Sequence, residues 1–162
     1  MDFEKIRNYR NTYNTYIVKQ GILLEEVGPG YARIVKTVGA NELNMDQRVH
    51  GGLFFVMADA AAGAAMVHHG HKAVTVNASW NFLRGAESGA VLTAEAREVK
   101  SGKNLCVIDV QLHDQENRLL GTGSFTYYLL DEPSFCCGSA RNSPPLQMGA
   151  DSMKPSGCQD AM

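Results

Sequence analysis

The stretch that decides the fold is Gly51–Gly70, which reads GGLFFVMADAAAGAAMVHHG. Its alanine and methionine residues favour helix, and Gly70 is suited to ending one. Asp59 is the only acidic residue in a segment that is otherwise apolar on nearly every side. A helix that is apolar all round is buried all round, so we expect this segment to be the central helix of the fold.

The segments on either side of this helix have the pattern of strands joined by short turns. Before it, residues 22–27 and 31–38 flank the turn signal Gly28-Pro29-Gly30. After it come four strand candidates, at residues 73–83, 90–100, 104–112 and 119–130. Short links between long strands favour an antiparallel meander. The predicted fold class is therefore α+β, with a long central helix wrapped by a curved antiparallel β-sheet.

The length of 162 residues predicts one domain, over residues 1–132. Within it, residues 1–18 are expected to form an amphipathic helix, because apolar residues recur there at steps of three and four. Residues 39–50 are polar and aperiodic and are predicted to form a loop. Residues 133–162 are rich in Ser, Pro and Gly, and we expect an irregular tail there.

The overall charge excludes one broad class of function. Fifteen Lys and Arg residues against seventeen Asp and Glu residues give a formal net charge of −2, so the chain lacks the basic surface of a general nucleic-acid binder. We expect no apolar run to approach the ~20 residues that span a bilayer. The start of the chain lacks the apolar core of a secretory signal. We therefore expect a cytoplasmic protein with neither nucleic acid nor membrane as a partner.

Neither a metal site nor a nucleotide site is indicated. Three histidines, His68, His69 and His71, lie near the end of the central helix, but no acid or cysteine stands at ligand spacing from them. Gly121-Thr122-Gly123 is only a fragment of a dinucleotide-binding motif. The cysteines are too few for a disulfide scaffold and match no zinc spacing; they are Cys106, Cys136, Cys137 and Cys158. The prediction is no metal and no cofactor.

The start of the central helix is the candidate centre for chemistry. The first backbone N–H groups of a helix have no partner within it, and the helix dipole makes this end positive. Gly52 would let a carbonyl oxygen approach those N–H groups, which could then stabilise an oxyanion. Asp59 lies seven residues later on the same face, roughly 10 Å along the axis. One carbonyl cannot touch both, but a second helix across a two-fold axis would bring Asp59 of one chain near Gly52 of the other.

Asp59 itself could act as a general base or as a nucleophile. The alternative is a structural aspartate held by neighbouring donors, and the sequence names no such donor. Tyr127 and Tyr128, later in the chain, are expected only to pack in the sheet.

Two motifs then carry a resemblance. His50-Gly51-Gly52, with Asp59 seven residues later, resembles the signature of the PaaI-like acyl-CoA thioesterases of the hotdog fold. The segment of residues 77–84, NASWNFLR, resembles the strand that follows in that family, although Gly85-Ala86 stands where Pro-Ala is common. The resemblance covers about residues 20–130 and omits the tail.

The resemblance implies a hydrolase that cleaves acyl-CoA thioesters. We expect it to be active as a homodimer or homotetramer, because the sheet edges and apolar helix faces of such small subunits are normally buried by pairing. Gly52 would bind the thioester carbonyl, Asp59 of the partner chain would be base or nucleophile, and His50 would orient the thioester. Asn44 would position water or substrate. The remaining substrate-binding residues expected are Gly51, Phe55 and Arg84. For Arg84, binding to CoA, a salt bridge and a plain surface position all remain open.

Two other functions are compatible with these residues. The first is a noncatalytic acyl-CoA-binding hotdog protein, which a variant of Asp59 would distinguish by retaining binding. The second is a hotdog dehydratase of hydroxyacyl thioesters, against which the HGG directly before the helix argues. The sequence leaves the acyl group and the choice between direct attack and activated water open.

Overall fold

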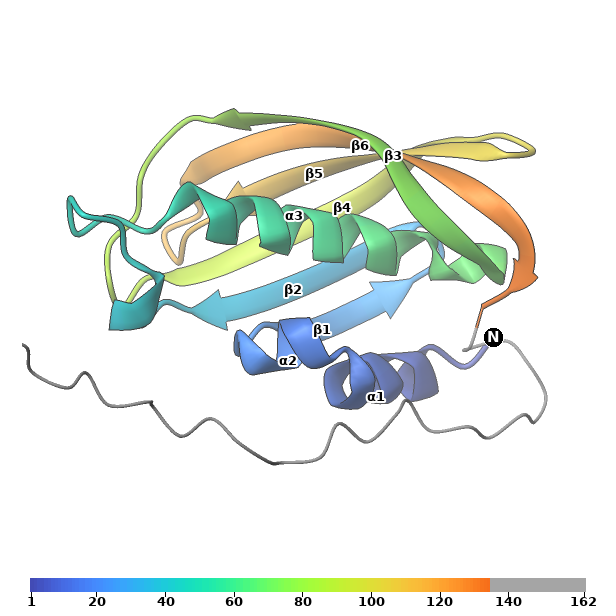
Figure 1. Cartoon of the computed structure of the whole chain (residues 1–162), viewed down its shortest axis with the longest axis horizontal. Coiled ribbons are helices and arrows are strands. Elements are labelled where there is room, and N and C mark those ends of the chain that lie inside the picture. Colours follow the sequence, from blue (N-terminus) through green and yellow to red (C-terminus); the bar gives the residue numbers. More distant parts are fainter. Residues whose placement is uncertain (135–162) are drawn as a thin grey trace, which may run out of the picture.

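The computed structural model describes residues 1–134, so nearly all of the predicted tail, with Cys136, Cys137 and Cys158, lies outside the described residues. Within them, helix α3 (Gly51–Ala65) lies across one face of a six-stranded antiparallel sheet that curves around it (Figure 1). The predicted fold class, an α+β fold with a long central helix wrapped by a curved sheet, is confirmed.

The strands fall close to their predicted positions. Two precede the central helix and four follow it: β1 (Leu23–Gly28), β2 (Tyr31–Thr37), β3 (His71–Phe82), β4 (Val91–Ser101), β5 (Leu105–His113) and β6 (Leu119–Pro133). Their inward positions alternate with outward ones, as in Leu92, Ala94 and Ala96, which are fully buried beneath α3.

The predicted meander is wrong in one respect. The strand order is β1-β2-β4-β5-β6-β3, so β3 pairs with β6 at the far edge while β4 pairs with β2. Gly123 of β6 allows β3 to lie beside β6 at this point. A Cβ there would lie 2.2 Å from the carbonyl oxygen of Ser79 in β3, which is too close for any other residue. Link length alone does not fix which strand lies beside which.

Helix α3 begins and ends at recognisable signals. His50 is its N-cap, and the chain continues from Ala65 through a 3-10 turn, η2 (Met66–His69), to Gly70. Gly70 has φ of 74°, in the left-handed region that favours glycine, so its predicted part in ending the helix is confirmed.

The expectation that α3 is buried on every side is wrong for the single chain. The sheet covers only one face, where Met57, Ala58, Ala61 and Ala62 are fully buried. The opposite face is partly or fully exposed along a stripe at helical spacing, and we call these residues the open stripe of α3: Gly52, Phe55, Val56, Asp59, Ala60 and Gly63.

The N-terminal segment forms two helices rather than the single one predicted over residues 1–18. Helix α1 (Phe3–Tyr13) and helix α2 (Thr15–Lys19) are separated at Asn14, whose backbone leaves the helical region. The Arg10 guanidinium donates to the carbonyl oxygen of Gly63, 2.9 Å away, which ties α1 to α3. In the predicted loop, one 3-10 turn forms, η1 (Ala40–Glu42).

The expectation about apolar length also needs correction. The continuous helical stretch Gly51–His69 has 19 residues and, by length and composition alone, is long and apolar enough to cross a membrane. Slightly more than half of it is buried inside the fold, where it is the core helix beneath the sheet. The core helix of a globular domain has the same length and apolar composition, so this stretch is weak evidence for a membrane span.

Candidate active site

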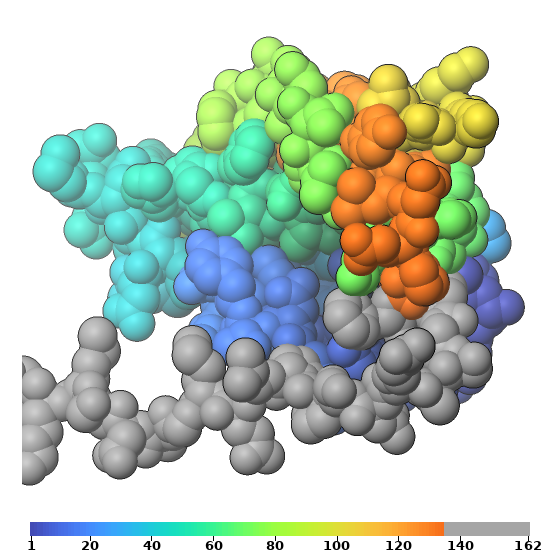
Figure 2. Space-filling view, turned by 45° about the vertical axis from the view of Figure 1, so that its right-hand side comes forward, coloured from blue at the N-terminus to red at the C-terminus, as the bar shows by residue number. Residues whose placement is uncertain are grey.

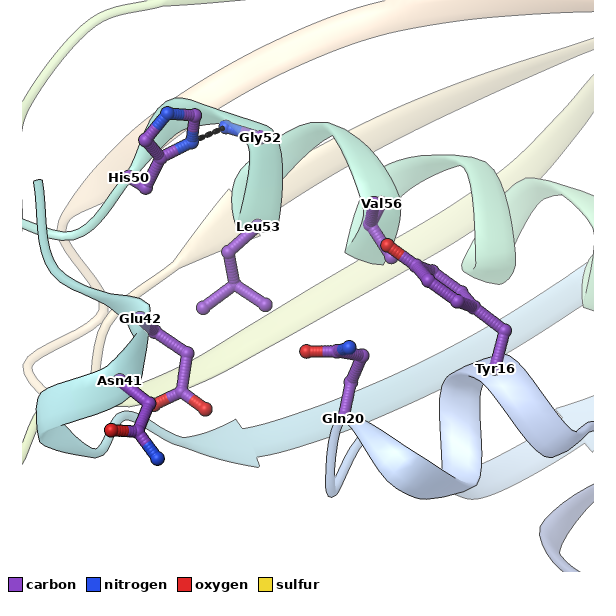
Figure 3. Close-up of a pocket in the computed structure, with 8 residues that line it drawn as sticks. All are labelled: Tyr16, Gln20, Asn41, Glu42, His50, Gly52, Leu53 and Val56. Atoms are coloured by element: carbon purple, nitrogen blue, oxygen red, sulfur yellow. Dashed lines mark hydrogen bonds between the residues drawn. The ribbon is translucent and has the colours of Figure 1, made fainter. Parts of the chain in front are cut away.

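A small cavity opens at the N-terminal end of α3. Its volume is about 280 Å³. His50 and Gly52 lie on one side of it, and Tyr16 and Gln20, from α2 and its end, lie on the other (Figure 3). The full lining is Tyr16, Gln20, Asn41, Glu42, His50, Gly52, Leu53 and Val56.

The Gly52 N–H is already engaged in this chain. It donates a hydrogen bond to His50 Nδ1, 2.9 Å away, and this bond caps the helix. A carbonyl oxygen entering the cavity would therefore have to replace the imidazole at this N–H. Gly51 has a packing requirement instead, because a Cβ there would lie 3.1 Å from the Phe82 ring.

An ion pair between the buried Lys36 and the partly buried Glu42 holds the wall of this cavity in place. Lys36 Nζ lies 3.1 Å from Glu42 Oε1 and donates to the carbonyl oxygen of Gln20 at 2.6 Å. Burial acts to raise the pKa of Glu42, but the hydrogen bonds from Lys36 and from the Gly39 N–H outweigh it and hold that pKa below its usual value. The end of α2 and η1 are thereby joined beside the helix start.

Asp59 has two hydroxyl donors from neighbouring strands. Thr75 of β3 donates to Asp59 Oδ1 at 3.2 Å, and Tyr127 of β6 donates to the same oxygen at 3.0 Å. The Tyr127 hydroxyl also lies 3.1 Å from the Asp59 carbonyl oxygen. Burial raises the pKa of Tyr127, as does the adjacent Asp59 charge, so the phenol stays a protonated donor. These are the partners that the sequence could not name.

A second cavity, of about 410 Å³, surrounds Asp59. Its walls are mostly apolar and aromatic, and Phe55 is one of the residues that line it. The lining comes from both N-terminal helices, α3 and two strands: Arg10, Asn14, Tyr16, Ile17, Phe55, Val56, Asp59, Ala60, Gly63, Thr75 and Tyr127. An apolar pocket with a few converging polar groups is the usual form of a small-molecule site.

The structure does not bring Gly52 and Asp59 into one cavity within a single chain. Each lines its own hollow along the open stripe of α3, and the two hollows share only Tyr16 and Val56. The predicted separation of the two groups along the helix is therefore consistent with the arrangement in a single chain.

Asn44 is placed away from both cavities. Its side-chain oxygen accepts hydrogen bonds from the backbone N–H groups of Asp46 and Arg48, both at 3.0 Å. This arrangement organises the loop that projects from the body of the molecule beside the start of α3 (Figure 2). In the single chain, the Asn44 side chain, which was expected to position water or substrate, is hydrogen-bonded to the backbone of its own loop.

Arg84 lines a third, polar cavity of about 510 Å³. Arg48 and Arg118 line it too, but they are paired with Glu87 and Asp114 respectively. This hollow contains neither Gly52 nor Asp59, so the structure separates Arg84 from the other predicted site residues.

Sequence reasoning missed Thr75 and Tyr127 as partners of Asp59. A tyrosine at an inward strand position needs a partner for its hydroxyl, so the inward place of Tyr127, two residues after the buried Phe125, was a usable signal. Thr75 offers no such signal, because its partner lies 16 positions away on another element.

Comparison with known proteins identifies similar sequences. A family model described as the thioesterase superfamily matches residues 47–120. Acyl-coenzyme A thioesterase PaaI of Escherichia coli K12 is 35% identical over 98 residues, which cover 60% of this chain and 70% of that protein.

Solved structures show the same architecture. The PaaI protein from the phenylacetic acid degradation operon of E. coli superposes with a TM-score of 0.72 at 27% identity, over 80% of this chain and 97% of that one. A hypothetical thioesterase protein of Streptococcus pneumoniae TIGR4, solved with coenzyme A, has a TM-score of 0.66 at 28% identity, over 70% of this chain and 91% of that one. Two further structures of the protein so described carry single alanine substitutions, one at an aspartate and one at a threonine 16 positions after it.

Proposed function

Because this chain belongs to the thioesterase superfamily, among its PaaI-like members with the hotdog fold, we propose that it hydrolyses acyl-CoA thioesters to a free acid and CoA. Carbonyl binding at the start of α3 and a carboxylate from a second copy of the chain would together carry out the reaction. No cofactor is required, since a thioester carbonyl is electrophilic and a thiolate leaves readily.

The observation that carries this proposal is the setting of Asp59. Its Oδ1 is held by two hydroxyl groups, and no described residue donates a hydrogen bond to its Oδ2, beside an apolar cavity. Oδ2 is therefore the oxygen that would activate water or attack the carbonyl. The spacing of Asp59 and Thr75 matches that of the aspartate and threonine replaced in the S. pneumoniae protein.

A second copy of the chain is proposed to complete the site. The open stripe of α3 leaves Phe55 and Val56 partly uncovered, and β3, at the edge of the sheet, exposes Val74 and Val76. An unpaired edge strand and an uncovered apolar helix face are both normally buried by association. Across a two-fold axis, Asp59 of one copy would reach the Gly52 cavity of the other. A homodimer is the smallest assembly that satisfies this, and a homotetramer would pair two such dimers.

The chemistry follows from these placements. The thioester carbonyl oxygen would replace His50 Nδ1 as the acceptor of the Gly52 N–H hydrogen bond. The N–H would then stabilise the oxyanion as it forms. Asp59 would either remove a proton from water as its oxygen bonds to the carbonyl carbon, or attack that carbon itself and form an anhydride that water hydrolyses. In either case the carbon–sulfur bond breaks and the CoA thiolate takes up a proton. Phe55 would contact the acyl group.

The polar cavity of Arg84 is the proposed place for the anionic part of CoA. Of its three arginines, Arg48 and Arg118 are paired with acids, so Arg84 is the cation proposed to contact phosphate. The S. pneumoniae neighbour solved with coenzyme A supports CoA as the ligand class.

The first test is hydrolysis of short, long and aromatic acyl-CoAs, followed by release of free thiol. Turnover by the wild-type chain on at least one of them is expected. Saturable acyl-CoA binding without turnover on any member of the panel would overturn the proposal in favour of a noncatalytic binder. Elimination of water from hydroxyacyl-CoAs, without thiol release, would indicate a dehydratase.

Subunit complementation tests the two-chain site. Gly52→Val places a side chain where a Cβ already lies 2.8 Å from His50 Nδ1, and Asp59→Asn removes the carboxylate, so each variant alone should be inactive. Mixed dimers formed by refolding the two variants together would contain one intact site, and activity should reappear. Continued inactivity of dimers shown to be mixed would mean that both groups act within one chain.

A further inference from the structure

The opposite end of the central helix carries a side-chain cluster that the proposed hydrolysis does not use. His68 and His69, in η2, meet Glu98 of β4. Glu98 continues the inward alternation of Ala94 and Ala96, so its carboxylate points toward the core rather than toward solvent. The side chains of Glu98, His69 and His68 are 12%, 14% and 24% exposed.

The three side chains converge on one point. His69 Nε2 lies 2.7 Å from Glu98 Oε2, and His68 Nε2 lies 3.5 Å from the same oxygen. One nitrogen or oxygen from each residue falls within 4.8 Å of the other two. Within the described residues, no Lys or Arg forms an ion pair with this carboxylate, and its ion-pair partners there are the two imidazoles.

We propose that His68, His69 and Glu98 bind a divalent transition-metal ion of the zinc type. Imidazole nitrogen and carboxylate oxygen are common zinc ligands, at about 2.0–2.2 Å from the metal. Tetrahedral coordination at those lengths separates the ligand atoms by roughly 3.3 Å, which modest side-chain movement from the observed distances achieves. Three protein ligands leave a fourth position for water, so the ion would exchange with solvent.

The surroundings of His68 allow the tautomer that a metal requires. His68 Nδ1 lies 3.0 Å from the Gly30 N–H and 3.1 Å from the carbonyl oxygen of Ala65. With the proton on Nε2, Nδ1 accepts from Gly30. With the proton on Nδ1, it donates to Ala65 and leaves the Nε2 lone pair for a metal. Such an outer hydrogen bond to a backbone carbonyl is the usual support of a metal-binding histidine. The Gly30 N–H, in the turn between β1 and β2, would then lose its bond to His68 Nδ1 and donate to solvent instead.

The sequence predicts no metal here for a simple reason. Glu98 is 29 positions from His69, on a strand, and no local spacing reveals it. The third histidine of the sequence cluster, His71, is not part of the site, since its ring contacts the carbonyl oxygen of Leu130. The bound ion would join the end of the central helix to β4, away from the Gly52 and Asp59 cavities.

The test is equilibrium binding of Zn²⁺ and Co²⁺ to the full-length chain after treatment with a chelator. Thiolates of the C-terminal segment could also bind these ions, so a Cys136→Ser/Cys137→Ser/Cys158→Ser background is measured beside the wild-type chain. One ion per chain is expected in that background, with a rise in the thermal unfolding midpoint. Glu98→Gln and His69→Gln should each weaken binding by at least ~100-fold, whereas the matched control His71→Gln should bind as the background does.

Direct spectroscopy covers the case in which a variant fails to fold. X-ray absorption of the Zn²⁺-loaded background should show two imidazole ligands, two oxygen ligands (Glu98 and water) and no sulfur. Failure of the background chain to bind Zn²⁺ or Co²⁺ saturably would overturn the proposal, and so would binding that persists in both Glu98→Gln and His69→Gln.

Discussion

The two faces of α3 differ in what they do with the same helical backbone. Toward the sheet, Met57, Ala58, Ala61 and Ala62 have no exposed surface. On the other side, the open stripe carries the helix's one acid, Asp59, and borders both cavities at its Gly52 and Asp59 positions. Apolar composition therefore does not show which face belongs to the core and which to a site.

The difference shows how one charge is accommodated on an apolar helix. Asp59 sits on the face that the sheet does not cover, and two strands beyond the helix supply its hydroxyl donors, Thr75 and Tyr127. A buried carboxylate without donors would be costly. The buried face needs only matching volume, whereas the open stripe needs particular hydrogen-bond partners. Substitutions on the two faces should therefore separate stability from activity.

The largest expected effect is on activity, from Asp59→Asn. Loss of the base or nucleophile should lower the rate of thioester hydrolysis by about 10³-fold. The unfolding midpoint should change little, because the asparagine carbonyl can still accept from Thr75 and Tyr127. Thiol-release kinetics and thermal unfolding measure the two effects. The control is Asp109→Asn, an exposed acid on β5, and an equal loss of rate in both variants would refute the assignment.

The next largest effect is on stability, from Met57→Ala on the buried face. Removal of this fully buried side chain should lower the free energy of unfolding by about 3 kcal/mol. The rate of hydrolysis per folded molecule should stay within about twofold. Urea titration measures the change, with Met45→Ala, at a 97% exposed methionine, as the matched control. A loss below about 1 kcal/mol would mean that this face is not closely packed.

A smaller effect is expected from Tyr127→Phe, which removes one donor from Asp59 and keeps the ring. We expect kcat to fall by about tenfold and the free energy of unfolding to fall by about 1 kcal/mol. Tyr128→Phe, on the next and more exposed residue, should change neither. A fall in stability alone, with kcat unchanged, would show that Tyr127 supports the fold and does not position the carboxylate.

The smallest effect is a pH dependence carried by the same tyrosine. The pKa of Tyr127 is raised in the folded chain, so its contribution to stability is complete below the ordinary tyrosine pKa of ~10 and is lost as pH rises above it. Between pH 10 and 11 the wild-type chain should lose about 1 kcal/mol more than Tyr127→Phe. Urea titrations at the two pH values give this difference, in which the other titrating groups cancel. Parallel losses in both chains would show that this phenol is not held protonated.

Much of the fold could be predicted because its signals are local. The central helix, its end at Gly70, the turn at Gly28-Pro29-Gly30 and all six strands follow from periodicity and turn residues. The break at Asn14 was missed because the apolar spacing continues across it. The β3–β6 pairing was missed because it depends on backbone approach at Gly123, which pattern alone does not reveal.

The candidate site was predicted only in part. The sequence identified Gly52 and Asp59 as important and placed them on one face of one helix, and the structure gives them separate cavities on that face. The sequence did not reveal that the Gly52 N–H donates to His50 Nδ1, nor that the Asn44 side chain accepts hydrogen bonds from the backbone of its own loop. Such competing hydrogen bonds depend on side-chain orientation, which spacing does not fix.

By itself, the sequence determined the elements of this protein, its central apolar helix and the acid on that helix, since helix and strand periodicity and end signals act over a few residues. Only the tertiary structure decided which face of α3 stays open, which hydroxyls hold Asp59, and that Glu98 meets His68 and His69. These contacts join residues far apart in the chain, and they form only when the sheet curves around the helix and packing brings its strands to either side.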